Sequence, residues 1–197
     1  MQPLFVGSHP AIDFLNTAFT PDGEQVETIS DGRAYLDWLI GAGLLDEAVA
    51  ARLARRFGAK ALDAAAAEAR KVREWTRGWL NRWRTAANGG YQEEVATLNK
   101  LLARQATRHE VIATGEGLSL VEWPRIENAD ALLGLIAAQI ADLITKEEAS
   151  LIKTCAGPKC TLWFLDKTKA HRRMFCSASA CGNRAKVAAF RQRQRET

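Results

Sequence analysis

Four cysteines lie close together near the C-terminal end of the sequence and are the side chains best suited to chemistry. They form two pairs, with four residues inside each pair and fifteen residues between the pairs. Two such pairs, separated by a short loop, supply the four thiolates of a tetrahedral zinc site. Four protein ligands close the coordination sphere and leave no position for a reactive water, so the predicted single Zn²⁺ ion is structural. The predicted ligands are Cys155, Cys160, Cys176 and Cys181.

Two other uses of these cysteines stay open at this point. A pair of disulfides requires an oxidising compartment, but the first residues, MQPLFVGSHP, lack the basic region and apolar run of a secretion signal. Four unconnected buried thiols fit poorly with a cluster that spans only 27 of 197 residues. The longest apolar stretch, residues 131–144, is too short to cross a bilayer. These features favour zinc in a soluble cytoplasmic protein with no membrane partner.

The charge of the chain divides unevenly between its two parts. Residues 151–197 carry eleven Lys or Arg and two acidic residues, a net charge of +9, whereas residues 1–150 carry 16 basic and 21 acidic residues, a net charge of −5. A separate basic segment is typical of proteins that bind a polyanion, most often nucleic acid. A solvated basic surface and a protein-binding module are the alternatives. DNA is the partner that we expect.

The segment from Ala180 to Arg195 predicts a helix that starts beside the last cysteine. The positive end of its dipole favours the thiolate of Cys181, and the missing side chain of Gly182 is expected to let backbone and thiolates approach closely. Val187 and Phe190 lie on a strip between two basic faces and are expected to pack onto the zinc core. Arginine suits phosphate because its planar fork forms two parallel hydrogen bonds. The residues predicted to contact DNA are Arg172, Arg173, Arg184, Lys186, Arg191 and Arg195.

Two stretches of the sequence resemble known families. The CGNR zinc finger family is resembled by the motif Cys181-Gly182-Asn183-Arg184 together with the following AKVAAFRQRQR. The opening motif of the ABATE domain is resembled by the segment from Gly7 to Thr17, GSHPAIDFLNT. ABATE domains are the usual N-terminal partners of CGNR fingers. The resemblance implies a bacterial, stress-induced transcription regulator. Residues 1–148 would form a helical domain that senses a small-molecule effector or forms a homodimer, and residues 149–197 a basic zinc finger that binds DNA.

The remaining patterns predict a mainly helical (α+β) fold. Apolar periodicity predicts helices over residues 30–40, 46–57, 60–87, 91–106 and about 130–144, and residues 108–124 predict a small β-hairpin. A short apolar strand is expected before Gly7, and a helix is expected to start at Pro10. The zinc module is expected to be treble-clef-like. It would consist of a knuckle, a short hairpin and a helix carrying the second cysteine pair.

Catalytic patterns are lacking in the sequence. The three histidines, His9, His109 and His171, lie in no catalytic or metal-binding motif, so we expect a protein that is not an enzyme. Asp13 and Asn16 are candidates for contact with a ligand of the N-terminal domain, with capping or turn roles as the alternative. Tryptophans four residues apart in 60–87 indicate a core face or an apolar pocket. The alternative function is a zinc-stabilised small-molecule- or protein-binding module without a DNA role.

Overall fold

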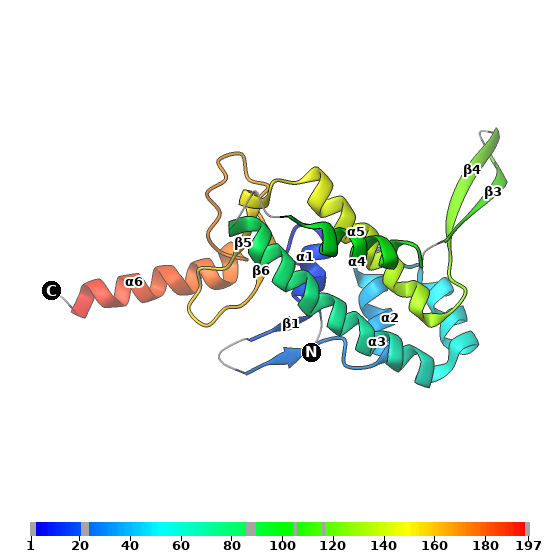
Figure 1. Ribbon diagram of the computed structural model, residues 1–197. Helices are drawn as coiled ribbons and strands as arrows, with labels where there is room; N and C mark the ends of the chain where they lie inside the picture. Colours follow the sequence, from blue (N-terminus) through cyan, green and yellow to red (C-terminus); the bar gives the residue numbers. More distant parts are fainter. Residues whose placement is uncertain (1–2, 21–23, 86–89, 105, 116, 196–197) are drawn as a thin grey trace.

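A computed structural model of the chain describes residues 3–20, 24–85, 90–104, 106–115 and 117–195, except the side chains of Ala106, Arg108, Trp123 and Arg195. It shows a helical body from which a β-hairpin and the last helix project (Figure 1). The prediction of a mainly helical protein with small β elements and a C-terminal zinc module is confirmed.

In the described part of the chain, five α-helices form the body, and their apolar faces meet in one core. The central helix α5 buries Ile136, Ile140 and Leu143 completely, as its wide apolar face predicts. The tryptophan stripe of α3 also faces the core, with Trp79 buried. None of the described helices is long and apolar enough to cross a membrane. The helices are α1 (Pro10–Leu15), α2 (Gly32–Gly41), α3 (Glu47–Thr85), α4 (Gln92–Leu102) and α5 (Leu132–Lys146).

Helix α3 contains the break that the sequence predicts at Gly58. The backbone there has φ 73° and ψ 165°, which leaves the helical region. A residue with a side chain is strained at such a positive φ, whereas glycine adopts it without steric cost. The two predicted helices are therefore two segments of α3, joined at this glycine.

The N-terminal segment differs from the prediction in one respect. Residues 3–6 form no strand but lie against the C-terminal segment, where the amide of Leu165 donates to the carbonyl of Gly7 at 2.8 Å. A strand needs a neighbour that supplies a ladder of backbone hydrogen bonds, and the backbone bond from Leu165 reaches Gly7, one residue beyond this segment. Helix α1 starts at Pro10 as predicted, with His9 as its cap. The unpredicted strands β1 (Ala18–Phe19) and β2 (Val26–Glu27) pair in antiparallel fashion just after α1.

The predicted hairpin is present and extends away from the body (Figure 1). Strand β3 (Ala106–Thr114) pairs with β4 (Gly117–Arg125) in antiparallel register from Ala106↔Arg125 to Thr114↔Gly117. Val111, Leu118 and Leu120 are 63%, 80% and 65% exposed on it. The hairpin is thus long and solvated, with apolar side chains on its surface.

The C-terminal segment is packed into the body rather than tethered to it. Strands β5 (Ile152–Thr154) and β6 (Trp163–Leu165) form an antiparallel pair, and Ile152, Trp163 and Leu165 belong to the same core as the body helices. A π-helical turn, η3 (Ala178–Gly182), then leads into α6 (Asn183–Arg195). The division into 1–148 and 149–197 stays a prediction, and the packing joins the two segments into one structure.

Candidate metal centre

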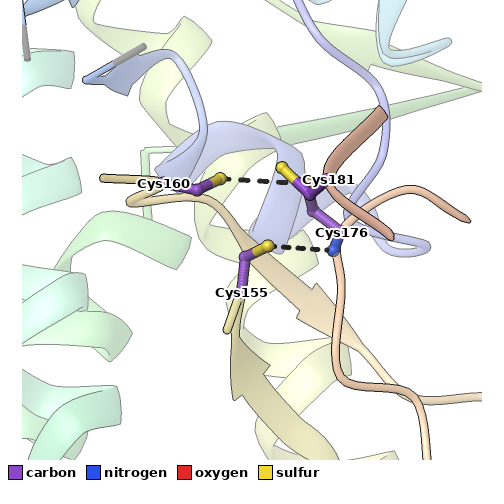
Figure 2. Close-up of side chains that lie close together, drawn as sticks. All are labelled: Cys155, Cys160, Cys176 and Cys181. Atoms are coloured by element: carbon purple, nitrogen blue, oxygen red, sulfur yellow. Dashed lines mark hydrogen bonds between the residues drawn. The ribbon is translucent and has the colours of Figure 1, made fainter. Parts of the chain in front are cut away.

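The four cysteines come from four places in the C-terminal segment and converge on one point (Figure 2). Cys155 follows β5, Cys160 ends the knuckle before β6, Cys176 ends a long loop, and Cys181 lies in η3. Their sulfur atoms all lie within 4.8 Å of one another. The Sγ atoms of Cys160 and Cys176 are 3.8 Å apart, and those of Cys176 and Cys181 are 3.6 Å apart.

These distances fit one tetrahedral zinc ion. Bonds of about 2.3 Å from zinc to four sulfurs place the sulfurs roughly 3.8 Å from one another. A disulfide requires a sulfur–sulfur distance of about 2.05 Å, and all four cysteines are free thiols. The four thiolates therefore form a site for one structural Zn²⁺ ion, as predicted. The disulfide and separate-thiol alternatives do not describe this arrangement.

The negative charges of the four thiolates require a cation beside them. Burial opposes ionisation of Cys155, but the amides of Cys176 and Gly157 donate to its sulfur at 3.3 and 3.4 Å and hold its pKa below the ordinary value of a thiol. Burial, together with the neighbouring thiols, raises the pKa of Cys160 to about 11 and that of Cys176 still higher. Four sulfurs this close together, three of them on buried cysteines, cannot all ionise without a compensating cation. Zn²⁺ supplies that charge.

The glycine that permits close approach to the sulfurs is Gly157, and the expectation for Gly182 is wrong. A Cβ atom on Gly157 would lie 3.2 Å from the sulfur of Cys181 and 3.4 Å from that of Cys155. A Cβ atom on Gly182 would meet no atom closer than the Ser177 carbonyl oxygen at 3.5 Å, which is ordinary contact. The knuckle turns at Gly157, so its backbone approaches the metal ligands.

Gly157→Ala is therefore expected to weaken zinc binding roughly tenfold, the size of effect typical of groups that support metal ligands. The metal-bound sulfurs have little freedom to move away from the added methyl group. Gly182→Ala is the matched control and should change the affinity less than twofold. Competition with a chromophoric chelator measures both, and a larger loss for Gly182→Ala would contradict this assignment.

A buried carboxylate fixes the loop that carries Cys176. Asp166 is fully buried and accepts hydrogen bonds from Lys153 Nζ at 2.7 Å, from the amide and hydroxyl of Thr168, and from the amide of Arg173 at 2.9 Å. Burial opposes its ionisation, but these donors hold the pKa of Asp166 well below its usual range. Asp166 thus anchors the loop between β6 and Cys176.

Arg173 differs from the prediction that it contacts DNA. Its guanidinium lies 4.3 Å from the centre of the Phe164 ring. Its nitrogens donate to acceptors on both sides of the joint between the N-terminal segment and the zinc module. These acceptors are the carbonyls of Val6, Phe175 and Cys176 and the hydroxyl of Ser8. The side chain is engaged in holding the fold, whereas the neighbouring Arg172 is exposed.

Arg173→Ala is expected to lower the free energy of unfolding by about 2–4 kcal/mol, since it leaves several partly buried acceptors without a charged donor. Arg172→Ala, one residue earlier, should change it by less than about 0.5 kcal/mol, as at an ordinary surface position. Urea denaturation of the zinc-loaded protein measures both. Equal stability of the two variants would show that the contacts of Arg173 contribute nothing.

Asp13 and Asn16 also bind backbone groups of the protein itself. The Asn16 amide donates to the carbonyl of Trp163 at 2.9 Å and accepts from its amide at 2.8 Å, which fastens α1 to β6. The Asp13 carboxylate accepts from the amide of Gly7 at 2.7 Å, and burial raises its pKa to about 6. The ligand role predicted for these residues has no support here, because backbone groups occupy both side chains.

Comparison with known families now adds to this geometry. Residues 8–147 match the family described as "ABATE: Putative stress-induced transcription regulator", and this match covers well over half of the chain. The chain belongs to the ABATE family. Residues 152–194 match the CGNR zinc finger, as the resemblance of the sequence predicts. A comparison with curated proteins finds no match.

The arginine of the CGNR motif contacts a metal ligand in this ABATE-family protein. Arg184 Nη2 donates to the sulfur of Cys181 at 3.2 Å. A zinc ion with four thiolates carries a net charge of −2, so a cation in this place offsets part of it. The sequence predicts only a DNA contact for Arg184. Its position three residues after a ligand on the same helix is the signal that could have revealed this contact.

The CGNR helix α6 leaves the zinc module instead of packing on it (Figure 1). Val187 is 41% exposed and Phe190 is 54% exposed, so the expectation that they pack onto the zinc core is wrong. That core is already filled by Leu162, Phe164 and the N-terminal Phe19. Lys186 and Arg191 are exposed on α6, and the side chain of Arg195 lies outside the described residues.

Proposed function

We propose that this ABATE-family protein is a zinc-dependent bacterial transcription regulator of the cytoplasm, with no catalytic activity, that binds DNA through α6. The observation that carries the proposal is a projecting basic helix whose first turns are anchored by the zinc site. Cys181 and Arg184 tie its start to the metal centre. Beyond this anchor the helix is exposed on several sides, which leaves room for a large partner.

Charge supports a polyanionic partner. Residues 151–197 carry a net charge of +9, and the exposed cations of α6 lie on more than one side of the helix. Lysine and arginine that neutralise DNA phosphates release counterions, and this release dominates affinity. The cations proposed for DNA contact are Arg172, Arg184, Lys186, Arg191, Arg193 and Arg195, whereas Arg173 is withdrawn from the set.

The proposal is tested by fluorescence anisotropy of labelled duplex DNA with the zinc-loaded full chain at several salt concentrations. About five phosphate contacts give a slope of roughly −4.5 for log affinity against log salt, or about a 500-fold loss between 50 and 200 mM. A chain that does not bind DNA even at 50 mM salt would contradict the proposal. Binding without salt dependence would contradict the electrostatic part of it.

A cavity in the body supports a second function, the sensing of a small molecule. It has a volume of about 820 Å³ and is lined by apolar side chains such as Leu44 and Val49, by three arginines including Arg52, and by the acidic Asp46 and Glu110. Ligand pockets commonly have volumes of 300–1,000 Å³. The effector would be an apolar molecule with an anionic group. The fluorescent apolar anion anilinonaphthalene sulfonate should bind here, and Val49→Asp should abolish its signal without lowering zinc content.

A further inference from the structure

Helix α6 has three kinds of surface that run along its length. At 100° per residue, Asn183, Val187, Phe190 and Gln194 lie within an arc of about 60°. All four are exposed, and the two apolar side chains lie in the middle of the arc along the helix axis, between the two amides. We call these four residues the α6 strip. Exposed valine and phenylalanine on a helix that projects into solvent indicate a surface that a partner covers.

Cations line both edges of the α6 strip. Arg184 and Arg191 lie at one edge, and Lys186 and Arg193 lie at the other, on the same helical projection. The opposite side of the helix carries small residues, among them Ala188 and Ala189, which are also exposed. An apolar and amide-bearing centre with a positive row on each side matches a groove that has a phosphate backbone on each side.

We infer that the α6 strip enters the major groove of DNA and recognises A·T base pairs there. The major groove is about 12 Å wide and accepts one helix. The chemistry of the strip matches the exposed edge of an A·T pair. Thymine presents an apolar methyl group that suits Val187 and Phe190, and adenine presents the donor and acceptor that suit the amides of Asn183 and Gln194. The two basic rows would then bind the flanking phosphates. This inference rests on the proposed DNA binding and adds which bases are recognised.

A second copy of the chain is the less favourable occupant of the α6 strip. Two α6 helices packed strip to strip would bring the rows with Lys186, Arg191 and Arg193 against identical rows. Juxtaposed like charges across an interface cost several kcal/mol in general. Between these basic rows and a polyanion, the electrostatic interaction is attractive. Charge therefore selects DNA over a copy of the same helix.

The test is selection of bound sequences from a randomised duplex library by the full zinc-loaded chain. Val187→Ser/Phe190→Ser removes the apolar centre of the strip, and Ala188→Ser/Ala189→Ser makes a similar change on the opposite side. Wild type and the control should both enrich the same A·T-containing site. The strip variant should bind that site at least tenfold more weakly, while its affinity for unrelated duplex and its salt slope stay within twofold.

A second measurement isolates the thymine methyl group. Replacing the contacted thymine with uracil removes only this methyl, and wild type should lose about fourfold in affinity, which corresponds to ~0.8 kcal/mol. The strip variant should be insensitive to the replacement. Zinc content and helicity of both variants are measured first, and because Val187 and Phe190 are exposed, both variants should fold.

The outcomes separate this inference from the function on which it rests. Salt-dependent DNA binding with equal enrichment by wild type and strip variant would overturn the inference and leave the proposed function intact. A strip variant that changes only the oligomeric state would also overturn it, since the α6 strip would then be the contact surface for a second copy of the chain. Lack of DNA binding by every form would overturn both.

Discussion

Replacing Cys176 with serine is expected to abolish tight zinc binding and to unfold the zinc module. Cys176 has close sulfur contacts to both Cys160 and Cys181, and its amide donates to Cys155. Structural zinc contributes roughly 10–16 kcal/mol to the folding of small zinc modules. The purified variant should hold less than about 0.1 equivalent of zinc. Zinc content measured by elemental analysis after dialysis gives the result.

The change should spread to the N-terminus but not through the whole body. The cysteines share a small core with Phe19, and Leu4 and Val6 pack against it, so this N-terminal segment should lose protection as well. Helices α2, α3 and α5 share a larger core, to which the zinc module adds only Ile152, Trp163 and Leu165 among the buried residues described, and should remain folded. Hydrogen exchange distinguishes the two regions. Ala156→Ser, at an exposed position of the knuckle, is the control and should keep one equivalent of zinc. A Cys176→Ser protein that also keeps one equivalent would contradict the site.

The second large effect concerns DNA affinity. The triple variant Lys186→Gln/Arg191→Gln/Arg193→Gln should bind duplex DNA roughly 500-fold more weakly at 0.1 M salt, and its salt slope should be smaller by about 2.7. Each cation that is removed leaves one phosphate un-neutralised, so the counterions of that phosphate are no longer released on binding. Anisotropy titrations at several salt concentrations measure both quantities.

A charge-matched control is available on the body. Arg52→Gln/Arg55→Gln/Lys60→Gln removes three exposed cations from α3 and lowers the net charge by the same amount. It should change the affinity for DNA less than about threefold, because these residues lie on the body and not on α6. Equal losses in the two triple variants would show that overall charge, and not α6, governs binding.

The metal centre could be predicted from the sequence because its chemistry is local. Four thiolates within 27 residues have few arrangements, and zinc imposes one geometry on them. The hairpin and the main helices were likewise predictable from apolar periodicity. The break at Gly58 was visible because glycine marks it in the sequence.

The structural roles of Arg173 and Asn16 could not be predicted from the sequence. Arg173 bonds to the carbonyl of Val6, and Asn16 bonds to the backbone of Trp163, partners 167 and 147 residues apart in the chain. Only the packing of the N-terminal segment on the zinc module brings them together. A basic residue next to a zinc ligand looks the same in sequence whether it faces phosphate or a buried carbonyl.

The orientation of α6 could not be predicted from the sequence for a related reason. An apolar strip between basic faces predicts that Val187 and Phe190 face something apolar, but it does not identify what that is. The zinc core is filled by Phe164 and Leu162, so the strip remains exposed. Whether the zinc core has room for Val187 and Phe190 depends on the residues that fill it, and these come from both ends of the chain.

The most direct test of the account is photo-crosslinking of the zinc-loaded chain to labelled duplex DNA. A benzophenone side chain placed at Phe190 reports on α6, and one placed at Leu118 reports on the projecting hairpin, where the side chain is more exposed than that of Phe190. We predict efficient crosslinks from position 190 at 50 mM salt, few at 200 mM salt, and few from position 118 at either. Crosslinks from position 118 alone, or bound DNA without a crosslink from position 190, would contradict the claim that α6 contacts DNA.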